Sequence, residues 1–324
     1  MEPWSTILHL LKRDGAAALV TIAKAEGSTP REAGARMTVA RDGAITGSIG
    51  GGPLEWAAID TARQRIERGR GAEWATVSLG PALDQCCGGR AEILHEAFDT
   101  TDLDWIAALA SHQGAEITAR GERLDDGPYR RRIVTASAKD EPILREPSGN
   151  LLEHFGEAKT PVLLFGAGHV GRALVAALAP LPFTVRWIDD RPDAFEGADA
   201  LAARKIVSAL PESELSAAPD RSLAIVMTHS HALDLAIVAA ALPNPRFAYV
   251  GLIGSATKRA LFERRLAEFS VASDAIARLV CPIGVSGIFG KSPPVIAAAV
   301  AAELLIVRER LTAGSNIKTE LALG

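Results

Sequence analysis

A glycine-rich segment that joins an apolar run to a helical pattern constrains the fold of this chain more than any other feature. The segment Gly166–Gly171 reads Gly-Ala-Gly-His-Val-Gly and follows the apolar run Val162–Phe165. Glycines in this spacing, between a strand and a helix, permit a tight turn and the close approach of a phosphate to the helix N-terminus. The segment therefore predicts a strand–turn–helix unit of a doubly wound sheet.

The same alternation of strand and helix continues toward the C-terminus. We expect strands at 184–189, 223–228 and 248–253, and helices at 170–179, 232–242 and 257–269. This order implies a parallel sheet that is covered by helices on both faces.

Two acidic residues, Asp189 and Asp190, end the strand expected at 184–189, about 20 residues after the glycines. An acid at this place binds ribose hydroxyls in dinucleotide-binding domains. The alternative is a Rossmann scaffold that binds no dinucleotide, because a fold does not imply a function.

The length of the chain predicts two domains, since its 324 residues exceed the ~250–300 at which single cores stop growing. We expect an N-terminal mixed α+β domain at 1–156 and a Rossmann-like, doubly wound parallel-sheet domain at 157–324, so that the fold class is α/β. Residues 137–160 lack a clear period, and their Pro, Glu, Lys and Gly content indicates a linker or an irregular domain edge.

Hydrophobic spacing predicts the elements of the N-terminal domain. Strands are expected at 18–25, 74–79 and 90–96, a hairpin at 36–40 and 44–48, and a helix at 103–111. A further helix should follow Gly50-Gly51-Gly52, where apolar residues recur every fourth position on one face: Leu54, Ala58, Ala62 and Ile66.

Composition excludes several classes of protein. The formal net charge of -4 provides no basic field for nucleic acid. The chain has only 3 cysteines, which fits a reducing cytoplasm better than a secreted disulfide scaffold. Its N-terminus lacks the pattern of a signal peptide, and the most apolar helical stretch, 295–307, is too short to span a bilayer. We expect a cytoplasmic protein without a membrane segment.

Two adjacent cysteines, Cys86 and Cys87, stand in the sequence Gln85-Cys86-Cys87-Gly88-Gly89. Neighbouring cysteines do not readily form a relaxed disulfide, and they are too close for the usual zinc pairing. They are therefore interpreted as thiols kept free for soft-metal or sulfur chemistry, or as small buried apolar residues. The two glycines would let another group approach the backbone.

Two further polar, glycine-rich segments precede this one, Glu26–Arg31 and Gly47–Gly52. Together with the cysteine segment they are three elements capable of lining one cleft. The alternative is three ordinary turns.

Polar residues also follow the strands of the second domain. His229 and His231, with Asp234 one turn on, are types that hold a divalent metal, or else Ser230 simply caps the helix. Ser255 and Lys258 begin the next helix, where free N–H groups and a cation could hold a phosphate, or form an ordinary capped helix. Cys281 is interpreted as a buried small residue.

Together these segments resemble the XdhC and CoxI family, accessory proteins of xanthine dehydrogenase and related molybdenum hydroxylases. The matching segments are 27–31, 47–52, 85–89, 166–171, 228–231, 251–255 and 282–284.

The resemblance implies a cofactor chaperone rather than an enzyme, with any catalytic role in sulfuration left open. Such proteins bind molybdenum cofactor (molybdopterin), protect it while a cysteine desulfurase supplies sulfur, and deliver it to the molybdenum subunit of apo-xanthine dehydrogenase. They are cytoplasmic and commonly homodimeric.

The cofactor-binding residues expected on this basis lie in both domains. Thiolates are soft donors that match a soft molybdenum centre, so Cys86 or Cys87 would contact the metal or receive sulfur. The full set is Ser28, Gly50, Gly51, Gln85, Cys86, Cys87, Gly88, Gly89, Gly166, Gly168, His169, Gly171, Asp189, Ser255 and Lys258.

Two other functions compete with this interpretation. An NAD(P)-dependent oxidoreductase would use the glycine-rich segment and Asp189, but its base could only be His229 or His231. A metal-dependent hydrolase would use these histidines with Asp234. The oxidoreductase leaves the paired cysteines unexplained.

Overall fold

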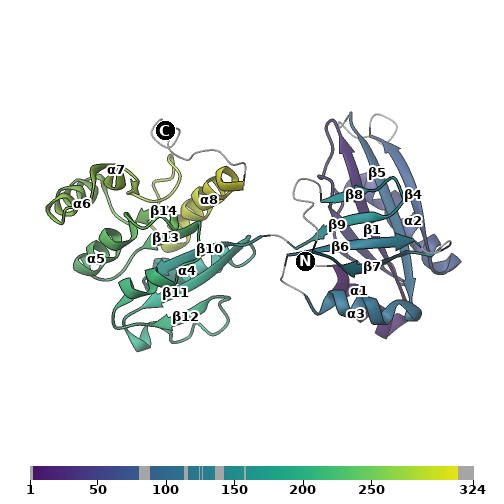
Figure 1. The fold of residues 1–324 in the computed structure, drawn as a ribbon, viewed down its shortest axis with the longest axis horizontal. Coiled ribbons are helices and arrows are strands. Elements are labelled where there is room, and N and C mark those ends of the chain that lie inside the picture. Colours follow the sequence, from purple (N-terminus) through teal and green to yellow (C-terminus); the bar gives the residue numbers. More distant parts are fainter. Residues whose placement is uncertain are drawn as a thin grey trace. The chain divides into compact units, whose positions relative to one another are not determined.

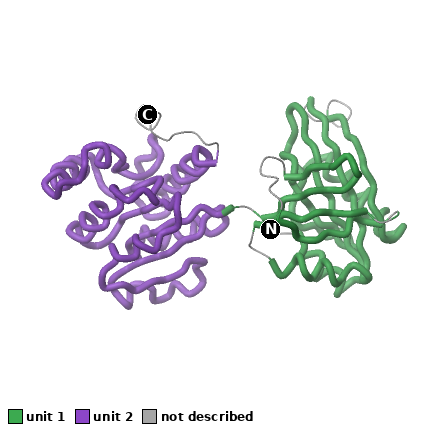
Figure 2. The backbone as a smooth tube through the Cα atoms, viewed as in Figure 1, with its two compact units in different colours: residues 1–158 green, residues 159–324 purple. Residues whose placement is uncertain are grey.

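The chain folds into two compact units, residues 1–158 and 159–324 (Figure 2). The computed structural model describes residues 3–79, 88–112, 116–123, 125, 127–135, 142–156 and 158–312. The division falls between Ala158 and Lys159, close to the boundary expected after residue 156.

A five-stranded antiparallel sheet forms the centre of the first unit, in the order β3-β2-β1-β5-β4 (Figure 1). The strands are β1 (Ala16–Glu26), β2 (Arg36–Ala40), β3 (Ile45–Gly47), β4 (Gly71–Ser78) and β5 (Arg90–Asp99). β2 and β3 form the expected hairpin, in which Gly43 adopts a φ of 87° and Asp42 accepts a hydrogen bond from the Ala44 N–H. Its Asp-Gly turn supplies the backbone that a tight hairpin requires.

Helix α2 (Gly52–Arg68) covers one face of this sheet. All four apolar residues that the spacing placed on one face are buried: Leu54, Ala58, Ala62 and Ile66. They pack against inward residues of β1 and β5 such as Val20 and Ile93. Burial of this stripe stabilises the helix, because most of the stability of a helix in a protein comes from the packing of its apolar face.

The other face of the five-stranded sheet, opposite α2, is covered by helices α1 (Pro3–Asp14) and α3 (Leu103–Ala110) and by a second sheet. This antiparallel sheet has the order β7-β6-β9-β8, from β6 (Ile117–Arg123), β7 (Tyr129–Ile133), β8 (Ile143–Arg145) and β9 (Leu151–Phe155). Two of its strands lie within 137–160, so the interpretation of that segment as a linker or irregular edge was wrong. Helix α1 was not predicted, although Trp4, Ile7 and Leu11 form its buried face.

A buried arginine joins the two sheets of the first unit. Arg131 on β7 donates to Glu96 on β5 at 2.7 Å and to Glu153 on β9 at 2.6 Å, and all three side chains are fully buried. The network explains how a strand with a buried Glu153 is stable, since a buried charge requires a partner.

The second unit is a Rossmann-type sheet with the order β12-β11-β10-β13-β14-β15, in which neighbouring strands run parallel. The strands are β10 (Thr160–Phe165), β11 (Phe183–Asp189), β12 (Arg204–Val207), β13 (Ser222–Val226), β14 (Phe247–Leu252) and β15 (Leu279–Val280). The predicted fold class, an α+β domain followed by a doubly wound parallel sheet, is confirmed.

Helices cover both faces of this sheet (Figure 1). Helices α4 (His169–Leu178) and α8 (Pro293–Thr312) pack on one face, and α5 (His231–Ala241) and α6 (Ala256–Glu268) on the other, followed by the short α7 (Ser273–Ile276). Between β10 and β13 the covering helices change sides, so the loops that leave these strands meet at the point where ligands bind in open α/β sheets. No helix in the described ranges is long and apolar enough to cross a membrane.

Candidate functional site

In the first unit, the glycine-rich segment 26–31 lies against segment 47–52 and against Gly88-Gly89. A Cβ on Gly89 would overlap the carbonyl oxygens of Glu26 and Ser28, and a Cβ on Gly27 would stand 3.2 Å from the Gly89 Cα. A Cβ on Gly50 would overlap the ring of Pro30. The segment 26–31 therefore touches both 47–52 and 88–89, and the interpretation of these segments as elements of one site has a geometric basis.

A buried carboxylate that the sequence did not single out shapes one of these segments. Glu55 accepts hydrogen bonds from the Ser48 hydroxyl at 2.7 Å and from the N–H groups of Ile49 at 2.9 Å and Gly51 at 3.1 Å. Burial alone would raise the pKa of Glu55, but these hydrogen bonds outweigh it and lower the pKa. An acid in the first turn of a helix, where free N–H groups gather, was the available signal.

Two glycine positions in the site remain open. At Gly51 and Gly88, no described atom lies within 4 Å of the place where a Cβ would stand. Gly89, by contrast, is enclosed by the chain itself. Of the two glycines expected to admit a ligand, Gly88 has the free space, and Gly89 serves to seat the segment on β1. Gln85, Cys86 and Cys87 lie outside the described residues.

The glycines of the second unit have separate roles. Gly166 adopts a φ of 114°, and a Cβ there would overlap the Met227 carbonyl, while a Cβ on Gly171 would overlap the Gly166 carbonyl. Gly168 is open among the described atoms and exposed, as is His169 at the start of α4. The first and third glycines are thus needed for packing, and the second leaves room for an approaching group, as in the dinucleotide fingerprint.

Asp189 is buried at the end of β11 and is fully engaged. Its carboxylate accepts from the Ala167 N–H, the Arg191 N–H and two nitrogens of the Arg191 guanidinium. Burial raises the pKa of Asp189, but the hydrogen bonds from Arg191 and Ala167 outweigh it and hold the pKa below its usual value. Neighbouring Asp190 lies 3.6 Å from the Nδ1 of His229.

The loops after β13 and β14 are tied together by Asp234. This buried carboxylate accepts from the Thr228 N–H at 2.9 Å and hydroxyl at 2.7 Å, and from the Lys258 ammonium at 2.7 Å. Lys258 also donates to the Ile253 carbonyl at 2.9 Å. Two of its three N–H donors are therefore committed inside the protein, which leaves one for an added phosphate.

The metal-binding trio of the hydrolase interpretation does not assemble. Asp234 is occupied by Thr228 and Lys258, and His231 is exposed at the start of α5, where Ser230 forms the expected N-cap by accepting from the Leu233 N–H. In the described part of the chain, Asp189, Asp190 and His229 do bring ligand atoms within 4.8 Å of one another. Because Asp189 is already bonded to Arg191, only Asp190 and His229 of this group could act as ligands to a cation.

Ser255 caps α6 by accepting from the Lys258 N–H, as expected. The Cys281 thiol lies beneath this turn and is buried, 3.9 Å from the Ser255 carbonyl. Burial raises the pKa of Cys281, so the group remains a thiol at neutral pH. Its expected role as a buried small residue agrees with this environment.

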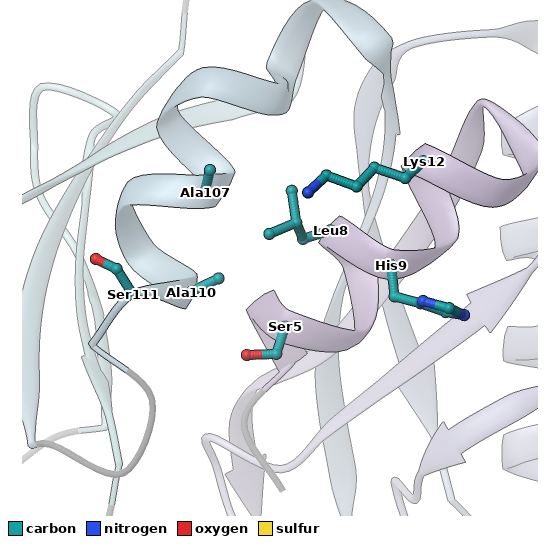
Figure 3. A pocket seen from close by; sticks show the side chains of 7 residues that line it. All are labelled: Ser5, Leu8, His9, Lys12, Ala107, Ala110 and Ser111. Carbon is teal, nitrogen blue, oxygen red and sulfur yellow. The ribbon is translucent and has the colours of Figure 1, made fainter.

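A shallow hollow in the first unit lies between α1 and α3 (Figure 3). It is lined by small or flexible side chains, among them Leu8, Lys12 and Ala107. None of the predicted site residues contributes to it. Its polar residues are Ser5, His9, Lys12 and Ser111.

Comparison with known proteins places both units in one family. A model described as the XdhC Rossmann domain matches residues 162–304, and the model of the XdhC and CoxI family matches residues 10–80. Together the two matches extend over more than half of the chain.

Two curated relatives align with nearly all of the chain. The uncharacterized protein YqeB of Escherichia coli (strain K12) is 28% identical over 315 residues, and the match covers 93% of this chain but 45% of that protein. The chain thus spans less than half the length of this relative. A probable xanthine dehydrogenase subunit of Bacillus subtilis (strain 168) is 27% identical over 357 residues, covering 96% of this chain and 99% of that protein.

A solved structure shares the fold. The crystal structure of a xanthine dehydrogenase from Bacillus halodurans superposes with a TM-score of 0.74 at 22% identity, over 97% of this chain and 98% of that one. The two family matches, one in each unit, show that the chain belongs to the XdhC and CoxI family.

Proposed function

We propose that this protein acts in the maturation of xanthine dehydrogenase, as a chaperone that binds molybdenum cofactor, protects it during sulfuration and delivers it to the apo-enzyme. Membership of the XdhC and CoxI family supports the role in maturation, and so does the Bacillus subtilis relative described as a probable xanthine dehydrogenase subunit.

The observation that carries the proposal is the seating of Gly89 between Glu26 and Ser28. This contact, with that of Gly50 on Pro30, gathers three segments that are separate in the sequence. The paired cysteines immediately precede Gly88-Gly89 in the chain. Gly89, which is enclosed at the junction of the segments, thus follows Cys87 by two residues.

The residues of this junction suit the cofactor in two respects. Cys86 and Cys87 would supply soft thiolate donors for molybdenum, and the open positions at Gly51 and Gly88 would admit a flat ring system against the backbone. When bound, the cofactor supplies a molybdenum centre competent for hydroxylation chemistry. The chain itself binds, orients and shields it, and performs no hydroxylation.

Within the second unit taken by itself, two helix N-termini offer a place for an anion such as a phosphate. Lys258 near Ser255 is already paired with buried Asp234, whereas Gly168 is open at the start of α4. This favours the α4 position, where N–H groups and the helix dipole attract an anion.

The remaining elements of the proposal concern partners. A cysteine desulfurase would supply the sulfur, and the molybdenum subunit of xanthine dehydrogenase would receive the cofactor. The active form would be a cytoplasmic homodimer.

The test is to purify the full chain without oxygen from a molybdenum-replete host, and to measure molybdenum and the fluorescence of oxidised pterin. We expect both in the wild-type protein, and a several-fold loss in Cys86→Ala or Cys87→Ala. Cys281→Ala is the matched control, since that thiol is buried in the other unit. Full retention in both cysteine variants would remove the thiols from binding, and absence of molybdenum and pterin from the wild type would refute the proposal.

A further inference from the structure

The Rossmann fold of the second unit implies a dinucleotide, and the residues that would hold one can be tested against that expectation. The phosphate end of the motif fits, since Gly168 is open and Gly166 and Gly171 pack as the fingerprint requires. The ribose end depends on Asp189, the acid at the end of β11.

The carboxylate of Asp189 has no acceptor position left for a ribose hydroxyl. Its Oδ1 accepts from the Arg191 N–H at 3.0 Å and Nε at 2.9 Å, and its Oδ2 from the Ala167 N–H at 2.7 Å and the Arg191 Nη2 at 3.1 Å. A carboxylate offers about four lone-pair positions, and these four hydrogen bonds use them. The side chain is only 1% exposed.

Arg191 would have to leave before a ribose diol could bind. Its guanidinium grips Asp189 through two parallel N–H donors, the strong bidentate form of this pair. Removal of the guanidinium would exchange a charge-assisted pair for two neutral hydroxyl bonds, at the edge of a buried site. Binding of an unphosphorylated ribose here is therefore opposed by the pair.

One carboxylate oxygen of the neighbouring Asp190 is also unavailable to a ribose hydroxyl. Its Oδ1 is buried and faces the Nδ1 of His229, on the loop after β13. That oxygen lies on the side of the histidine and is closed to solvent.

We infer that Asp189 is a structural carboxylate that fastens the glycine-rich loop to Arg191, and that the second unit consequently excludes NAD(H). This inference is independent of the proposed function and removes NAD(H) from the cofactors that the oxidoreductase interpretation could use.

The experiment is a fluorescence titration of the full chain with NADH. We expect no saturable binding by the wild type below the millimolar range. In Arg191→Ala, two acceptor positions of Asp189 become free, and we expect NADH to bind at least about tenfold more tightly than to the wild type, a difference of about 1.4 kcal/mol. Arg264→Ala, which removes an exposed arginine from α6, is the matched control and should behave as the wild type.

The structural role of Asp189 has its own readout. Asp189→Asn should lower the melting temperature without creating NADH binding, because an amide is a poor partner for the guanidinium and two N–H groups. Arg191→Lys serves if Arg191→Ala does not fold, since it retains the charge and gives up the bidentate geometry. Micromolar binding of NADH by the wild type, no gain in either Arg191 variant, or an unchanged melting temperature in Asp189→Asn would overturn the inference.

Discussion

Gly89 lies so close to Ser28 that a single added methyl group would overlap the Ser28 carbonyl oxygen. Its neighbour Gly88 has no described atom within 4 Å of the same position. Two adjacent glycines therefore differ in what they tolerate, and the difference can be measured.

Replacement of Gly89 by alanine should destabilise the first unit by about 1–3 kcal/mol, the usual cost of overpacking. Gly88→Ala should change the free energy of unfolding by less than about 0.5 kcal/mol. Denaturant unfolding of both variants provides the comparison. Equal stability of the two would contradict the seating of Gly89 on β1. If Gly88 admits the cofactor, Gly88→Ala should lose molybdenum while it keeps its stability.

Replacement of Glu55 by alanine should destabilise the first unit by about 2–4 kcal/mol. The change leaves the Ser48 hydroxyl and the N–H groups of Ile49 and Gly51 without their charged acceptor. Glu67→Ala, which removes an exposed acid from the same helix, is the control. A loss of the same size in both variants would show that general helix effects, and not the loop, determine the result.

Glu55 also predicts a pH dependence. Because its pKa is lowered in the folded protein, its stabilising contribution is present above the pKa of the unfolded chain, near 4.5, and is lost as the pH falls through the folded pKa. Between pH 7 and pH 3, the free energy of unfolding should fall more steeply with decreasing pH in the wild type than in Glu55→Ala. Parallel pH profiles in the two proteins would be evidence against this contribution.

His95 on β5 should make the protein sensitive to mild acid. Burial lowers its pKa from 6.5 to about 4, and neither ring nitrogen has a hydrogen-bond partner among the described residues. The folded state thus holds a neutral imidazole, so stability is full above pH 6.5 and declines as the pH falls toward 4. The total loss is on the order of 3 kcal/mol.

The measurement is the melting temperature between pH 7.5 and pH 4 for the wild type and His95→Leu. The variant should lose part of this slope, whereas His112→Ala, which changes an exposed histidine, should retain it. A slope that is the same in all three proteins would exclude His95 as its source.

The ion pair of Asp234 and Lys258 should be strongly coupled. The Asp234 side chain is fully buried and that of Lys258 is 13% exposed, so removal of either partner leaves an uncompensated charge and should cost about 3–5 kcal/mol. The double variant Asp234→Asn, Lys258→Met should cost less than the sum of the single variants, by about 0.5–3 kcal/mol. The measurement is the free energy of unfolding in urea. A loss in the double variant equal to the sum of the two single losses would contradict the coupling.

Local pattern was enough to predict much of the fold. The spacing of Leu54, Ala58, Ala62 and Ile66 predicted the buried face of α2, and the glycines at 166–171 predicted the turn from β10 to α4. In both cases the signal lies within one element and its immediate neighbours. Helix α1 carries the same kind of signal in Trp4, Ile7 and Leu11, but at the N-terminus, where a targeting segment is the first alternative to exclude.

Features that depend on distant partners could not be predicted in this way. In β9, every second residue is buried: Leu151, Glu153 and Phe155. Because the central one is charged, the sequence does not show the alternation of apolar and polar residues that indicates a strand. Its partner Arg131 lies on another strand, and no local pattern pairs them. For Asp189 the sequence was misleading, since its position suggested contact with a ribose. Only the side-chain geometry shows that Arg191 is paired with this carboxylate.

The buried Arg131 determines where this domain can be truncated and which residues a chimaera must contain. Any fragment that ends before β6 keeps Glu96 in the interior and discards its cation, although the family match at 10–80 ends well before that acid. Such a fragment would have to protonate Glu96 or admit water to it. The five-stranded sheet is therefore not a portable module, and a chimaera that transfers the cysteine segment to another protein must carry residues 117–155 with it.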